Sequence, residues 1–189
     1  MQSSLALLPV LRSETQGLLL AALMMDDDAD HTITGLAERI GVDPSTVLRE
    51  VDRLEEAGLL VTHRVGRTRV VAVNTDSPLV DPLRELVTRA LGPAPLLTRA
   101  VAAIPGVEQA LIFGSWAARS TGELAGTASD IDLLVIGEPS RDEVLDAVIP
   151  VERRLGRSVD VTFRTAIEWA DHSDPFVATV RSRPMIELR

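Results

Sequence analysis

The chain has 189 residues with an ordinary globular composition, 46% apolar and 25% charged, and this length suits one large domain or two small ones. It contains no cysteine, which excludes disulfides and thiolate metal sites. It also has no basic signal-peptide start and no apolar run of membrane-spanning length, so we expect a cytoplasmic protein without a membrane partner. The net charge of −9 argues against non-specific nucleic-acid binding by the whole surface.

The first part of the chain shows helical spacing of apolar residues. Leucines and alanines predict a first helix over 13–25, with Ser13 as its N-cap. After an acidic loop, we expect a short strand at 33–34 and a second helix over 36–40. Gly41 would end that helix, because glycine readily adopts the left-handed C-cap conformation.

A third helix is predicted to begin at Asp43 and Pro44, which suit the N-cap and the first helical position. Two helices joined by a tight turn are the helix-turn-helix arrangement. Residues 59–64 and 68–73 then flank a Val-Gly turn and predict a β-hairpin. A helix-turn-helix followed by a hairpin is the pattern of a winged helix, so we assign 1–76 to a winged helix-turn-helix domain.

Basic residues gather where such a domain would meet double-stranded DNA. The hairpin region between Leu59 and Val73 contains several arginines and no acidic residue, and polar residues of the third helix fall away from its apolar stripe. The predicted DNA contacts are Ser45, Thr46, Arg49 and Arg53 on the helix and Arg64, Arg67 and Arg69 on the hairpin. The alternatives are a solvated helix face with an exposed hairpin, or a helix-turn-helix that binds protein.

The remainder of the chain alternates between strands and helices. A connecting helix over 82–91 and a proline-rich interruption at 92–95 precede it, so we take 77–95 as a linker and 96–189 as a second domain. The alternation predicts an α/β domain. The expected strands are 109–113, 131–136, 158–163 and, shorter, 185–188, and the expected helices are 96–104, one from 115, 141–155, 165–170 and 176–183.

Glycine, serine and three acidic residues in this second domain suggest phosphate and metal chemistry. An apolar run ending in Gly114 and Ser115 predicts a strand that turns directly into a helix, a geometry that presents backbone N–H groups to a phosphate. Asp130 and Asp132 share one face of the next strand, about 6.6 Å apart along it. Carboxylates this close repel one another unless cations neutralise them, and Mg²⁺ prefers oxygen ligands.

Each acid also has a plain structural explanation. Asp130 and Asp132 can be hydrated residues at the entry of a strand. Asp160 lies between two valines in a later strand that we expect to be buried, and a buried acid is costly without a partner. The trio is therefore more informative than any single member.

Gly114-Ser115, Asp130-x-Asp132 and the lone Asp160 together resemble the DNA polymerase β-type nucleotidyltransferase superfamily. More narrowly, the chain resembles bacterial proteins that join a winged helix to a minimal nucleotidyltransferase domain. The resemblance implies an α+β fold overall, whose second domain has a mixed sheet flanked by helices. It also implies two Mg²⁺ ions and a nucleoside triphosphate, with ATP favoured. The connection between the Gly-Ser pair and the Asp-x-Asp pair is longer than in many family members.

The resemblance also implies residue roles. Asp130, Asp132 and Asp160 would bind the metals and catalyse nucleotidyl transfer, with Asp160 as general base. Gly114 and Ser115 would hold the triphosphate, and helical spacing alone places Arg119 beside them as a further nucleotide-binding residue.

Three functions fit these patterns. The first is a homodimeric DNA-binding transcriptional regulator whose second domain binds nucleoside triphosphate and Mg²⁺ and transfers a nucleotidyl group to an acceptor. The second is a minimal nucleotidyltransferase antitoxin that adenylylates a partner toxin, with a winged helix that binds protein. The third is a pseudo-enzyme that only senses the nucleotide. The intact carboxylate trio argues against the third, and the basic residues on the helix and hairpin favour the first over the second.

Overall fold

The chain divides into two compact units, Met1–Gly92 and Pro93–Arg189. The computed structural model describes residues 11–26, 30–121 and 130–188. The residues considered above for a signal peptide, and the long connection between the Gly-Ser and Asp-x-Asp pairs, lie largely outside these ranges. Among the helices that the described ranges contain, none is both long and apolar enough to cross a membrane.

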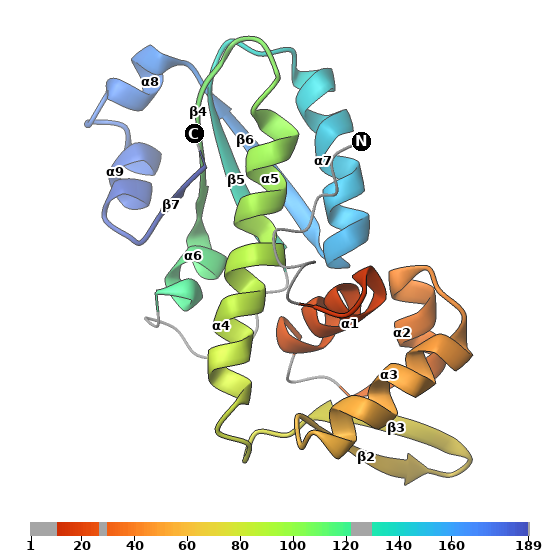
Figure 1. Cartoon of the computed structure of the whole chain (residues 1–189). Coiled ribbons are helices and arrows are strands. Elements are labelled where there is room, and N and C mark those ends of the chain that lie inside the picture. The colour runs from red at the N-terminus through yellow and green to blue at the C-terminus, as the bar shows by residue number, and fades with distance from the viewer. Residues whose placement is uncertain (1–10, 27–29, 122–129, 189) are drawn as a thin grey trace. The chain divides into compact units, whose positions relative to one another are not determined.

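The first unit combines helices with a small antiparallel sheet (Figure 1). Its strands pair in the order β1-β3-β2. The helices α2 and α3 form the predicted helix-turn-helix, and β2 and β3 form the predicted hairpin, here called the wing. The elements are α1 (Glu14–Met24), β1 (His31–Thr32), α2 (Ile33–Ile40), α3 (Pro44–Glu56), β2 (Leu60–Val65), β3 (Thr68–Val73) and α4 (Val80–Leu91).

Local signals set the helix ends in this unit, as predicted. Ser13 accepts a hydrogen bond from the backbone N–H of Gln16 at the start of α1. Asp43 accepts one from the N–H of Ser45 at the start of α3, and hydrogen bonds from Ser45 hold the pKa of the Asp43 carboxyl below its usual range. Gly41 ends α2 with a φ of 71°, in the left-handed region.

The short strand β1 lies at His31–Thr32, so the prediction of a strand at 33–34 is wrong. The reason is a cap. The hydroxyl of Thr32 accepts a hydrogen bond from the backbone N–H of Gly35 at 3.0 Å, and α2 therefore begins at Ile33 rather than three residues later.

The helix α4 belongs to the core of the first unit rather than to a linker over 77–95. It packs against α1, and Arg84 donates a hydrogen bond to the carbonyl oxygen of Met24 at 3.1 Å. Its buried residues Val80, Val87 and Leu91 join the same apolar cluster as α1, α2 and α3. The first unit is thus one hydrophobic core that includes α4.

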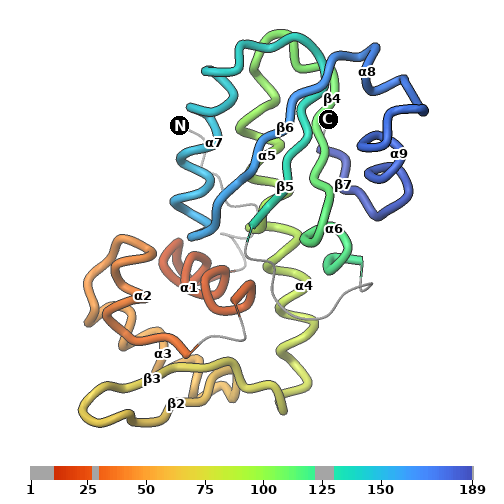
Figure 2. The backbone as a smooth tube through the Cα atoms, turned by 180° about the vertical axis from the view of Figure 1, so that it is seen from behind, coloured from red at the N-terminus to blue at the C-terminus, as the bar shows by residue number. Residues whose placement is uncertain are grey.

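The second unit is a mixed sheet flanked by helices. Its strands lie in the order β6-β5-β4-β7, and of the described strand pairs β5 and β6 run parallel while the others are antiparallel. Figures 1 and 2 show α5 and α7 together on one face of the sheet. The elements are α5 (Pro93–Val101), β4 (Val107–Phe113), α6 (Gly114–Ser120), β5 (Asp130–Gly137), α7 (Arg141–Leu155), β6 (Ser158–Arg164), α8 (Ala166–Ala170), α9 (Pro175–Arg181) and β7 (Ile186–Glu187).

The opposite face of the sheet is covered in part by α8 and α9. Leu134 and Ile136 of β5 are buried there in one cluster with Trp169 of α8. Because side chains alternate along a strand, Asp130 and Asp132 point to the same face as these two residues. They stand at the start of β5 and are half-buried.

Candidate functional site

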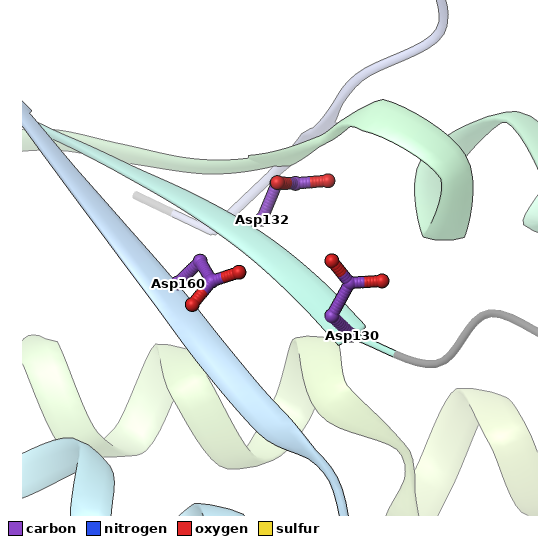
Figure 3. Close-up of side chains that lie close together, drawn as sticks. All are labelled: Asp130, Asp132 and Asp160. Carbon is purple, nitrogen blue, oxygen red and sulfur yellow. The ribbon is translucent and has the colours of Figure 1, made fainter.

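Asp130, Asp132 and Asp160 lie together at one end of the parallel strands β5 and β6 (Figure 3). Asp132 and Asp160 are register partners, so their side chains project from the same face, and Asp130 precedes Asp132 by two residues. One carboxylate oxygen from each residue lies within 4.8 Å of the other two. The structure therefore brings together the three acids singled out from the sequence.

Asp132 of this acidic cluster has a carboxyl with a raised pKa. Partial burial, followed by the negative charges of Asp130 and Asp160, raises the pKa of its carboxyl. A bound divalent cation would remove this repulsion, and carboxylate oxygens are the ligands that Mg²⁺ prefers. The donor set and its electrostatics therefore fit the hard divalent cation expected from the sequence.

Asp160 is exposed, so the expectation that it lies in a buried strand is wrong. Its strand β6 stands at the edge of the sheet and pairs with β5 alone among the described strands. Although Val159 is buried, Asp160 points to the other face, where solvent reaches it. Asp160 belongs to the acidic cluster because it lies beside Asp132, although it is not buried.

Gly114 joins β4 to α6 directly beside the acidic cluster. Its φ of 69° lies in the left-handed region, and a Cβ at this position would collide with the carboxylate of Asp132. Phe113, the residue at the N-cap of α6, is the register partner of Asp132 and has no side-chain oxygen to cap the helix. Ser115 follows in the first turn, whereas Arg119 lies in the last turn, half-buried.

In the first unit, α3 presents the predicted DNA-contact residues on its exposed side. Ser45 and Arg49 are exposed, and Arg49 donates to the hydroxyl of the half-buried Thr46 at 3.4 Å. The predicted apolar stripe is confirmed as buried, and it consists of Val47, Val51 and Leu54. The exposed side of the first half of α3 thus carries polar residues together with the exposed Leu48, and the buried stripe fixes it to the core.

Arg69 on β3 forms ion pairs within the domain. It donates to Asp52 and to Glu55 of α3, each at 2.6 Å. The hydrogen bond with Asp52 is the main cause that raises the pKa of the Arg69 guanidinium above its usual value. The sequence around the hairpin holds no acid, so only the packing of α3 against the wing reveals these partners.

Glu50 on α3 is a residue that the sequence analysis did not single out. It is 5% exposed, accepts from Arg53 at 3.0 Å, and also forms an ion pair with Arg12, which precedes α1. The predicted DNA contact Arg53 is therefore partly occupied by a neighbour three residues earlier. The spacing of three residues between Glu50 and Arg53 on one side of a helix could have indicated this ion pair from the sequence.

A helix-turn-helix followed by a two-stranded wing is a winged-helix domain, in which the second helix enters the major groove of DNA. Residues 12–69 match the MarR family. The N-terminal region is therefore a MarR-family winged-helix domain, the DNA-binding part of a transcriptional regulator. The match ends at residue 69 and does not include the second unit.

Solved structures also resemble part of the chain. Reduced HlyU from Vibrio cholerae is 23% identical with a TM-score of 0.36, and the match covers 44% of this chain and 82% of that chain. A MarR-family transcriptional regulator from Rhodococcus is 29% identical with a TM-score of 0.35, covering 44% and 58%. The transcriptional regulator BldR from Sulfolobus solfataricus is 23% identical with a TM-score of 0.40, covering 53% and 70%. No curated protein matches the chain.

Proposed function

We propose that this MarR-type regulator binds a nucleoside triphosphate with divalent cations through its second unit and transfers a nucleotidyl group from it to an acceptor hydroxyl, with pyrophosphate as the leaving group. The observation that carries the proposal is the convergence of Asp130, Asp132 and Asp160 within 4.8 Å of one another. A left-handed glycine, Gly114, adjoins them at a helix start. The resemblance to minimal nucleotidyltransferases rests on the same residues.

In the second unit, the acidic residues would bind the metal ions, and residues at the start of α6 would hold the triphosphate. Asp130, Asp132 and Asp160 offer the oxygens for two Mg²⁺ ions. Bound there, the ions would neutralise the triphosphate and lower the pKa of the attacking hydroxyl. Asp160 is exposed and would accept the proton of the acceptor hydroxyl as general base. Gly114 leaves room for the carboxylate of Asp132. The N–H groups that begin α6, next to Ser115, would meet a phosphate, and Arg119 follows on the same helix.

The winged helix would bind double-stranded DNA as part of a homodimer. The first half of α3, with Ser45, Thr46 and Arg49, would meet base edges, and Arg64 and Arg67 of the wing would meet phosphates. A nucleotide would regulate this binding if it favours one arrangement of the two winged helices. The MarR match over 12–69 favours a regulator over an antitoxin that modifies a toxin.

Nucleotidyl transfer is tested with ATP labelled at its α-phosphate, incubated with Mg²⁺, the full chain and a cell extract. We expect one acceptor to carry the label, and the double variant Asp130→Asn with Asp132→Asn to leave it unlabelled. The control Asp146→Asn, an exposed acid of α7, should label normally. Binding of ATP without label in any acceptor would overturn transfer and leave nucleotide sensing as the function.

A further inference from the structure

Two acidic residues of α3 hold both strands of the wing. Glu55 accepts a hydrogen bond from the hydroxyl of Thr62 in β2 through Oε1 and another from Arg69 in β3 through Oε2, each at 2.6 Å. Arg69 directs its other terminal nitrogen to Asp52, also at 2.6 Å. These four residues, which we call the wing brace, tie one side of α3 to neighbouring positions on both strands.

The alternation of β3 turns Arg69 toward α3. Val71 and Val73 share its side of the strand and are buried in the core, and the side chain of Arg69 is only 26% exposed. Both terminal nitrogens of its guanidinium already donate to carboxylates. One arginine with two carboxylates carries a net negative charge, so this group repels a phosphate.

The other arginines of the wing are placed differently. Arg64 lies directly opposite Arg69 in the hairpin, and Arg67 lies in the turn between β2 and β3. Both are exposed, and neither forms an ion pair with another residue in the described ranges. Two like charges directly opposite on neighbouring strands destabilise a hairpin. The carboxylates of the wing brace offset that repulsion and leave Arg64 and Arg67 as the cations presented to solvent.

We infer that Arg69 is a positioning residue that, with Asp52, Glu55 and Thr62, fixes the wing against α3, while Arg67 at the tip contacts a DNA phosphate. Fixed spacing matters because α3 and the wing must reach the same DNA duplex together, one in the major groove and one on the backbone. The inference revises the sequence-based role of Arg69. It rests on DNA binding by the winged helix and is independent of nucleotidyl transfer.

Salt dependence separates a positioning residue from a phosphate contact. The matched pair is Arg67→Gln and Arg69→Gln, which remove one positive charge each from the same hairpin. The assay measures the binding constant K of the full chain for a fluorescent mixed-sequence duplex at several salt concentrations. In Arg67→Gln, the negative slope of log K against log [salt] should become shallower by about 0.9, the value for one lost phosphate contact. Arg69→Gln should weaken binding roughly fivefold with the slope unchanged. An equal loss of slope in Arg69→Gln would overturn the inference.

A distance measurement tests the wing brace without DNA. Since the chain has no cysteine, nitroxides can be attached at Glu56→Cys on α3 and Val65→Cys on β2, both exposed. Their distance distribution should broaden in Arg69→Gln and in Glu55→Gln and stay narrow in Arg67→Gln. Identical distributions in all variants would overturn the brace. If neither substitution changes the salt slope, the wing contact with DNA fails, and the nitroxide distances alone decide on the brace.

Discussion

Replacing Asp132 by asparagine should stabilise the metal-free protein at neutral pH. Its carboxylate faces two others with oxygens within 4.8 Å, where two unit charges repel by about 0.9 kcal/mol in bulk water and about 3.5 kcal/mol at an effective dielectric constant of about 20. Because solvent reaches this half-buried site, the lower value applies to each of the two repulsions. We therefore expect a gain of about 1–2 kcal/mol in the free energy of unfolding. For a domain of roughly 100 residues, such as the second unit, each kcal/mol raises Tm by about 4–8 °C.

The pH dependence has a definite sign. Partial burial and the neighbouring charges raise the pKa of Asp132 in the folded state, so the folded protein holds this proton more tightly than the unfolded chain. The contribution of Asp132 to stability is complete in acid, below the ordinary pKa of an aspartate, and is lost as the pH rises through the raised pKa. The advantage of Asp132→Asn should therefore vanish in acid and grow toward neutral pH.

Thermal unfolding of the full chain by calorimetry, with and without Mg²⁺, measures both effects. Mg²⁺ should raise the Tm of the natural protein, because an ion bound only to the folded state stabilises it, and should raise that of Asp132→Asn much less. Asp146→Asn serves as the control for removing one negative charge from the second unit. A destabilised Asp132→Asn at neutral pH, or a stabilisation that is the same at every pH, would refute mutual repulsion in the acidic cluster.

Two further substitutions, each with a comparison variant, test a backbone turn of the second unit and a buried carboxylate of the first. Gly114→Ala should cost about 1–2 kcal/mol for its left-handed backbone and also abolish cation binding, measured by Mn²⁺ titration, because the new methyl group displaces the adjacent carboxylate. Gly41→Ala, with a similar φ but open space around the added atom, should pay only the backbone cost and keep cation binding. Glu50→Met should change the free energy of unfolding by less than about 1 kcal/mol, since the desolvation of a buried carboxylate offsets its ion pairs. Leu54→Ala on the same helix should cost about 2–5 kcal/mol, and equal losses would contradict this view of Glu50.

Much of the first unit could be predicted because its signals are local. Ser13, Gly41 and Asp43 mark helix ends through hydrogen bonds or backbone angles that involve only nearby residues. The place of α4 could not be predicted in this way. It depends on packing against α1, shown by the hydrogen bond of Arg84 to Met24, sixty positions earlier. Contacts at that separation leave no mark in a short window of sequence.

In the acidic cluster, too, some features follow from nearby residues and others depend on contacts between distant ones. The pattern Asp130-x-Asp132 predicts two carboxylates on one face, since strand alternation is local. That Asp160 joins them depends on the parallel register of β5 and β6, which the sequence does not encode locally. Its exposure was mispredicted for a related reason. The two flanking valines suggested a strand in the interior of the sheet. The strand β6 instead lies at the edge, where a neighbouring strand covers it on one side, and Asp160 is exposed there.

The distribution of acids also limits how nucleotide and DNA binding can be coupled. Three of the four carboxylates of α3 form ion pairs inside the first unit, with Arg53 and Arg69, and Arg49, Arg64 and Arg67 remain exposed to solvent in a chain of net charge −9. In the proposed loaded state, two Mg²⁺ ions add about four positive charges and the triphosphate about four negative ones, so the net charge hardly changes. Long-range electrostatics therefore cannot make DNA affinity depend on the nucleotide. Any such dependence must come from a change in the arrangement of the winged helices, and it must be reciprocal, with DNA altering nucleotide affinity by the same factor.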